Sequence, residues 1–77
     1  MKGSGLNTDW CAERAGEALR YLSRHYPEAS GSEELHPHQD AAHAAAVAED
    51  EAGYIEALRG YMRAGRDAAL RTRRGAA

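Results

Sequence analysis

The sequence predicts an all-α protein, a small three-helix bundle without strands. Seventeen of the 77 residues are alanine, the best helix former. Strands are not expected because Val47 is the only valine, Ile55 is the only isoleucine and threonine occurs twice. In three segments, apolar residues recur at the three- and four-residue spacing of an amphipathic helix. A chain this short buries only about 60% of its unfolded surface, so a homodimer that enlarges the core is an open alternative to a monomer.

The first predicted helix spans residues 8–26. Three polar residues at its start can accept hydrogen bonds from free backbone N–H groups, namely Asn7, Thr8 and Asp9. Pro27 disfavours helical geometry at Tyr26, which therefore ends the helix. Apolar side chains gather on one side of it: Trp10, Cys11, Ala15, Ala18, Leu19, Tyr21, Leu22 and Tyr26. We expect residues 1–6 to form a flexible leader and residues 7–72 to form a single domain.

The second predicted helix spans residues 37–52 and follows a loop rich in serine and glycine. Pro37 suits the first turn of a helix because proline has no N–H group that must be satisfied there. Five alanines share one face and let another helix approach to about 8 Å: Ala41, Ala44, Ala45, Ala48 and Ala52. Gly53 is expected to cap the carboxyl end of this helix.

The third predicted helix spans residues 54–72, and a basic tail of residues 73–77 is expected to fray. An apolar seam runs along the helix through Tyr54, Ile55, Ala57, Leu58, Tyr61, Met62, Ala64, Ala68 and Ala69. Because the link at Gly53 is short, the second and third helices should be antiparallel neighbours.

Charge is sorted along the chain. Residues 27–56 contain eight acidic residues and no lysine or arginine: Glu28, Glu33, Glu34, Asp40, Glu49, Asp50, Glu51 and Glu56. From residue 57 onward the arginines are Arg59, Arg63, Arg66, Arg71, Arg73 and Arg74. Asp67 is the only acidic residue in that segment. Either the two segments neutralise each other within a helical hairpin, or each presents a face of one sign to a partner.

A short motif in residues 50–64 places a glycine before a tyrosine, an Ala-Leu pair, a second tyrosine and a small residue. These positions are Gly53, Tyr54, Ala57, Leu58, Tyr61 and Ala64. The motif resembles the helix-turn-helix junction of tetratricopeptide repeats and of MIT domains, which are helical modules of microtubule-interacting and trafficking proteins. The resemblance implies two tightly packed helices and a role in binding peptides or protein tails. A repeat array is not expected because the chain contains no second copy of the unit.

One cluster has the residue types of a metal site: His36, His38, Asp40 and His43. If a helix begins near Pro37, Asp40 and His43 share a face and His36 lies close to them, so zinc or another divalent metal could be held there. The other interpretation is a polar, solvated helix start, with Asp40 near the positive end of the helix dipole. We favour this second interpretation and therefore expect no cofactor.

Cys11 is the only cysteine, which excludes an internal disulfide and fits a reducing compartment. The sequence also lacks the apolar run of a signal peptide or of a membrane span. We therefore predict a cytoplasmic protein that does not enter a membrane. We expect no enzyme activity, because the sequence contains no recognisable set of nucleophile, base and acid.

These observations predict a small non-catalytic interaction or accessory module that binds a protein partner through its third helix. The binding residues would be Leu58, Arg59, Tyr61, Met62, Arg63 and Arg66. The apolar members would anchor the partner, unless they fill the core instead, and the arginines would steer an acidic surface. Two other classes stay open: a nucleic-acid-binding regulator that uses the arginine helix, and a metal-binding protein that uses the histidine cluster.

Overall fold

The computed structural model describes residues 5–76 and contains three α-helices and no strand within that range. The helices are α1 (Thr8–His25), α2 (His36–Val47) and α3 (Glu51–Ala76). Two short 3-10 helices, η1 (Pro27–Ala29) and η2 (Glu33–Leu35), form the connection between α1 and α2. The predicted all-α class with three helices is confirmed.

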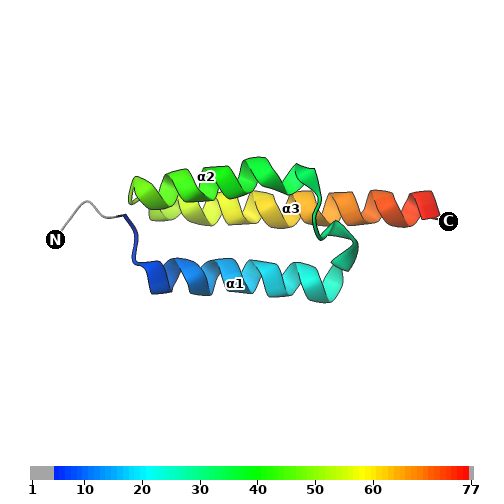
Figure 1. Cartoon of the computed structure of the whole chain (residues 1–77), viewed down its shortest axis with the longest axis horizontal. Coiled ribbons are helices and arrows are strands. Elements are labelled where there is room, and N and C mark those ends of the chain that lie inside the picture. Colours follow the sequence, from blue (N-terminus) through cyan, green and yellow to red (C-terminus); the bar gives the residue numbers. More distant parts are fainter. Residues whose placement is uncertain (1–4, 77) are drawn as a thin grey trace.

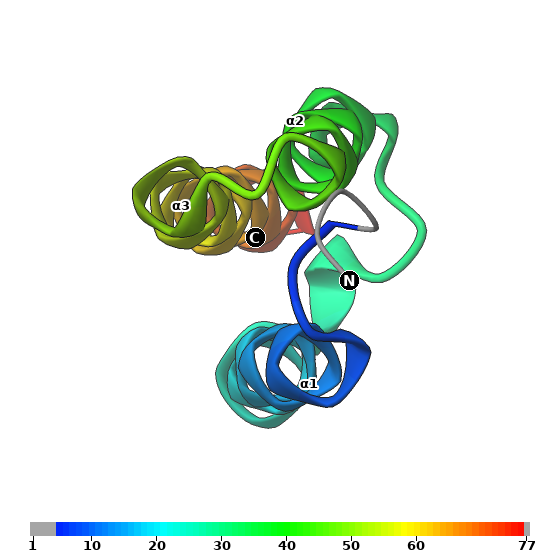
Figure 2. The same ribbon diagram turned by 90° about the vertical axis from the view of Figure 1, so that its left-hand side faces the viewer.

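Helix α3 is the longest element and packs against both other helices, whereas α1 and α2 remain apart along most of their length. Figure 1 shows α1 and α3 running in the same direction, with α2 antiparallel to both. The end-on view in Figure 2 shows α2 beside α3, with α1 below both. The resulting molecule measures 53 × 19 × 17 Å.

Helix α1 begins as expected, because the Asn7 side chain accepts a hydrogen bond from the Trp10 N–H at 3.0 Å. It ends at His25, one residue earlier than predicted, before Pro27. The expectation of a flexible leader is wrong at Leu6, whose N–H donates to the Ala46 carbonyl oxygen at 2.9 Å. Residues 1–4 of that leader lie outside the described residues.

The turn between α2 and α3 differs from the prediction. Gly53 does not cap α2; it lies in the first turn of α3. The turn is made by residues 48–50, where Glu49 adopts a left-handed backbone with φ of 60°. Asp50 then accepts a hydrogen bond from the Gly53 N–H at 2.9 Å and so caps α3. A Cβ at position 53 would meet the Asp50 carboxylate, so a larger residue there requires the capping side chain to shift.

The basic end of α3 is helical to Ala76, four residues beyond the predicted end at residue 72. Arg73 donates to the Glu28 carboxylate at 2.7 and 3.0 Å and to the His25 carbonyl oxygen at 2.8 Å. Arg71 forms an ion pair with Glu34. The acidic loop therefore neutralises the far end of α3, and this pairing explains why the helix does not fray after residue 72.

The core is formed by two groups of buried residues, both centred on α3. One group joins α1 and η2 to α3 and consists of Ala18, Leu22, Leu35 and Tyr61. The other joins α2 to α3 and consists of Ala42, Tyr54 and Ala57, with Leu6, Trp10 and Cys11 packed against it. Leu58 contacts both groups. Tyr61 is only 7% exposed and belongs to the core, which is the alternative that the sequence left open for it.

Candidate functional site

The predicted binding residues of α3 fall into two sets. Leu58 and Tyr61 pack into the core, as described above. Arg59, Met62, Arg63 and Arg66 instead line a shallow hollow on the outer side of the bundle, and the hollow is completed by Tyr21 from α1. Of the three predicted apolar anchors, only Met62 lies at this hollow. Tyr21, which was not among the predicted binding residues, lies there as well.

Tyr21 is the centre of this surface, because three neighbouring hollows share it as a lining residue. Its side chain is 39% exposed although tyrosine is largely apolar. Around it lie arginines from two helices, Arg14, Arg20 and Arg24 from α1 and Arg59, Arg63 and Arg66 from α3. We call these seven residues, together with Met62, the Tyr21 face.

Three arginines of the Tyr21 face form only weak ion pairs with neighbouring carboxylates. Arg14 pairs with Glu17 at 3.3 Å, Arg66 with Asp67 at 3.4 Å and Arg59 with Glu56 at 3.9 Å. Exposed pairs of this kind contribute only about 0 to 1 kcal/mol and leave the guanidinium groups of Arg59 and Arg66 accessible, whereas Nε of Arg14 is buried.

The remaining arginines of the face form no ion pair with a described residue. Within residues 5–76, no ion pair or hydrogen bond involves the side chains of Arg20, Arg24 or Arg63. All three are exposed. The Tyr21 face thus offers unpaired guanidinium groups beside an exposed aromatic ring.

The end of α3 is chemically different from the Tyr21 face. The hydrogen bonds that Arg73 donates lower the pKa of Glu28 below its usual value. The hydrogen bond to Glu34 raises the pKa of Arg71. The arginine stripe that the sequence predicted as one surface is therefore two: Arg71 and Arg73 hold the loop, and the arginines before them face solvent.

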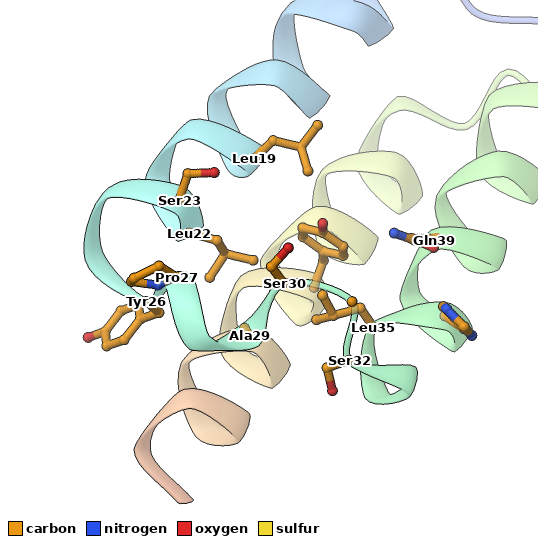
Figure 3. Close-up of a pocket in the computed structure, with 13 residues that line it drawn as sticks. Leu19, Leu22, Ser23, Tyr26, Pro27, Ala29, Ser30, Ser32, Leu35 and Gln39 are labelled. Atoms are coloured by element: carbon orange, nitrogen blue, oxygen red, sulfur yellow. The ribbon is translucent and has the colours of Figure 1, made fainter. Parts of the chain in front are cut away.

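A second concave surface lies between α1 and α2. It consists of two hollows of about 440 and 350 Å³, and Leu19, Gln39 and Tyr61 line both, so they form one continuous groove. We call it the α1–α2 groove. Figure 3 shows its wider end, where Leu19 and Leu22 of α1 face Gln39 and Leu35 across the opening. The loop of residues 27–35 closes that end.

The predicted metal cluster is not assembled. Among residues 5–76, no group of three or more His, Cys, Asp or Glu side chains is placed to hold a metal ion. Helical geometry places His36 and His38 on nearly opposite sides of α2. His38 lies against Gly60 of α3, while His36, Asp40 and His43 are exposed.

Comparisons with protein families, curated proteins and solved structures give no match to this chain. The resemblance of residues 50–64 to tetratricopeptide and MIT helices therefore stays a prediction. No helix in the described part of the chain is both long enough and apolar enough to cross a bilayer.

Sequence reasoning missed two residues that define these surfaces, Leu19 and Tyr21. Both were assigned to the buried side of the first helix, yet their side chains are 51% and 39% exposed. A signal was available: α1 carries eight apolar positions, which is more than contact with a single neighbouring helix can cover.

Proposed function

We propose that this protein is a small non-catalytic interaction module that binds an acidic segment of a protein partner on the Tyr21 face. The observation that carries the proposal is the convergence of arginines from α1 and α3 around one exposed tyrosine. Tyrosine and arginine are the residue types that most often dominate the energy of protein interfaces. Met62, partly buried beside them, adds a flexible apolar contact.

Charge favours an acidic partner. The unpaired guanidinium groups of Arg20, Arg24 and Arg63 can each form a charge-assisted hydrogen bond with a carboxylate. An acidic chain would also be steered to this face over a distance of about 10 Å at moderate salt. Two acidic residues of the loop, Glu28 and Glu34, pair with Arg73 and Arg71 at the far end of α3 and not with the arginines of the face.

Nucleic acid is a weaker candidate for the same arginines. Glu17, Glu56 and Asp67 are interspersed among them and would repel a phosphate backbone. The formal charge of the chain is −2, whereas nucleic-acid-binding domains are commonly basic. A protein partner can place apolar side chains on Tyr21 and Met62 and avoid these carboxylates.

Fluorescence anisotropy with two labelled probes tests the proposal. One probe is a synthetic amphipathic peptide with glutamates on one face and leucines on the other, and the second is single-stranded DNA. We expect the peptide to bind, and Arg63→Glu to weaken its binding about fivefold, equivalent to about 1 kcal/mol. Arg74→Glu is the matched control, because Arg74 is an exposed arginine of α3 that lies outside the face.

Three outcomes would contradict the proposal. The peptide could fail to bind at concentrations of about 1 mM. Arg63→Glu and Arg74→Glu could weaken binding equally, which would indicate attraction by overall charge rather than by the face. The DNA probe could bind more tightly than the peptide, with an affinity that falls steeply with salt, which would indicate a nucleic-acid-binding protein instead.

A further inference from the structure

The α1–α2 groove is an opening that the chain itself does not fill. Helix α1 rests on α3 and does not pack against α2 along most of its length (Figure 2). The floor of the narrower part is formed by Tyr54, Leu58 and Tyr61 of α3. Leu19 lines both hollows from α1 and is 51% exposed, so it adds apolar surface to the groove.

The groove has a protruding residue and a matching hollow on the same surface. Beside Leu19 lies a hollow of about 350 Å³ whose walls are formed by small residues, including Cys11, Ala15, Ala42 and Ala46. A leucine side chain fits such a space. Two copies related by a two-fold axis bring the same patch of both copies together, so each can supply the leucine and the hollow at once.

Among the described residues, no Asp, Glu, Lys or Arg lines either hollow of the groove, although 29% of the chain is charged. The histidines that line it are His36, His38 and His43. A partner that is strongly acidic or basic would gain nothing from such a surface. The identical surface of a second copy likewise lacks Asp, Glu, Lys and Arg, and its docking leaves the arginines of the Tyr21 face in solvent.

We propose that a second copy of this chain occupies the α1–α2 groove, with each copy's Leu19 inserted between α1 and α2 of the other. The groove follows α1 for about 20 Å, given a rise of about 1.5 Å per residue from Cys11 to Tyr26. With a molecular width near 19 Å, the area covered on each copy is on the order of 400 Å². The total of about 800 Å² is below the roughly 1,200 Å² at which stable specific interfaces begin, so the dimer is of the weak, transient kind and forms only at high concentration.

Sedimentation equilibrium of the full chain tests this inference between about 10 and about 500 µM. We expect the average mass to rise from 8.3 kDa toward twice that value. Leu19→Glu places a charge in the groove and should keep the protein monomeric throughout. Leu19→Ala removes the protruding side chain without adding charge and should raise the dissociation constant about tenfold.

Tyr21→Glu is the matched control. Tyr21 lies on the same helix and is also an exposed apolar residue, but it belongs to the Tyr21 face and not to the groove. This variant should dimerise like the wild type. Circular dichroism and thermal melting at low concentration establish that each variant is folded, so a loss of dimer is not a loss of structure.

Alkylation of Cys11 supplies a second measurement, because its side chain lines the groove. In the wild type the alkylation rate should fall as protein concentration rises, and in Leu19→Glu it should stay constant. The inference is overturned if the wild type remains at 8.3 kDa across the range, if Leu19→Glu dimerises, or if Tyr21→Glu abolishes the dimer as Leu19→Glu does. It does not depend on the proposed function, which is tested separately by peptide binding.

Discussion

Gly65→Ala tests the close packing of α1 on α3 that positions both surfaces. Gly65 is buried, and a Cβ added there would approach both terminal methyl groups of Leu22 at 2.7 Å. Leu22 is itself only 5% exposed and part of the core, so it has little room to move. Overpacking of this kind costs about 1 to 3 kcal/mol.

The substitution also has a favourable effect that must be subtracted. Alanine is better than glycine in a helix interior by about 1 kcal/mol. The expected net effect of Gly65→Ala is therefore a destabilisation of about 1 kcal/mol, which lowers the Tm of a domain this small by about 4 to 8 °C. Thermal unfolding followed by circular dichroism at 222 nm, a wavelength that reports helix, measures this shift.

Gly75→Ala is the matched control on the same helix. Gly75 is exposed and a Cβ there meets no atom within 4 Å, so only the helix-propensity effect operates. We expect this variant to be as stable as the wild type or slightly more stable. In a Leu22→Ala background, Gly65→Ala should become stabilising, because the colliding methyl groups are gone. If Gly65→Ala stabilises the wild-type protein as Gly75→Ala does, the described packing of α1 is wrong.

Two further predictions concern the ends of α3. Asp50→Ala removes the cap that accepts the Gly53 N–H and should cost about 1 kcal/mol in thermal unfolding, whereas Asp50→Asn should retain most of the stability; equal losses would exclude the cap. The lowered pKa of Glu28 means that its pairing with Arg73 stabilises the fold above the usual carboxyl pKa and ceases to do so as pH falls through the lowered value. Melting curves of Glu28→Gln should therefore lose less stability between pH 6 and pH 3 than those of the wild type, and parallel curves would contradict the pairing.

The three helices and their approximate bounds were predictable because helical periodicity is a local property. The turn between α2 and α3 was not predicted correctly. A glycine after a run of alanines is a common helix end, and nothing in the local sequence distinguishes that arrangement from an aspartate cap three residues earlier. The structure distinguishes them because the backbone turns at Glu49 and the Asp50 carboxylate reaches the Gly53 N–H.

The candidate surfaces were only partly predictable for a different reason. The sequence placed Arg59, Arg63 and Arg66 on the outer side of α3, and the structure agrees. It could not indicate that Arg71 and Arg73 are occupied by the acidic loop, because that pairing joins residues 37 and 45 positions apart. Long-range pairing of this kind depends on where the loop lies after the helices have packed.

The exposure of Leu19 and Tyr21 on α1 also depends on how the helices pack, which local sequence does not determine. A helix that lay between two neighbours would bury the whole apolar stripe of α1, but α1 contacts α3 without packing along α2. Successive residues of a helix are rotated by about 100°, so Leu19 and Tyr21 point about 160° apart. One therefore reaches the α1–α2 groove and the other reaches the arginines, on opposite flanks of the same helix.

This arrangement makes the two proposals separable in one set of variants. If both are correct, Leu19→Glu abolishes the dimer and leaves the affinity for the acidic peptide unchanged, whereas Tyr21→Ala weakens peptide binding and leaves the dimer intact. If Leu19→Glu instead lowers both by the same factor while the protein stays folded, dimerisation and peptide binding are coupled. Such a joint loss fits a peptide that binds across two copies, and Leu19→Ala separates this case from repulsion between the introduced carboxylate and the acidic peptide, because it weakens the dimer without adding charge.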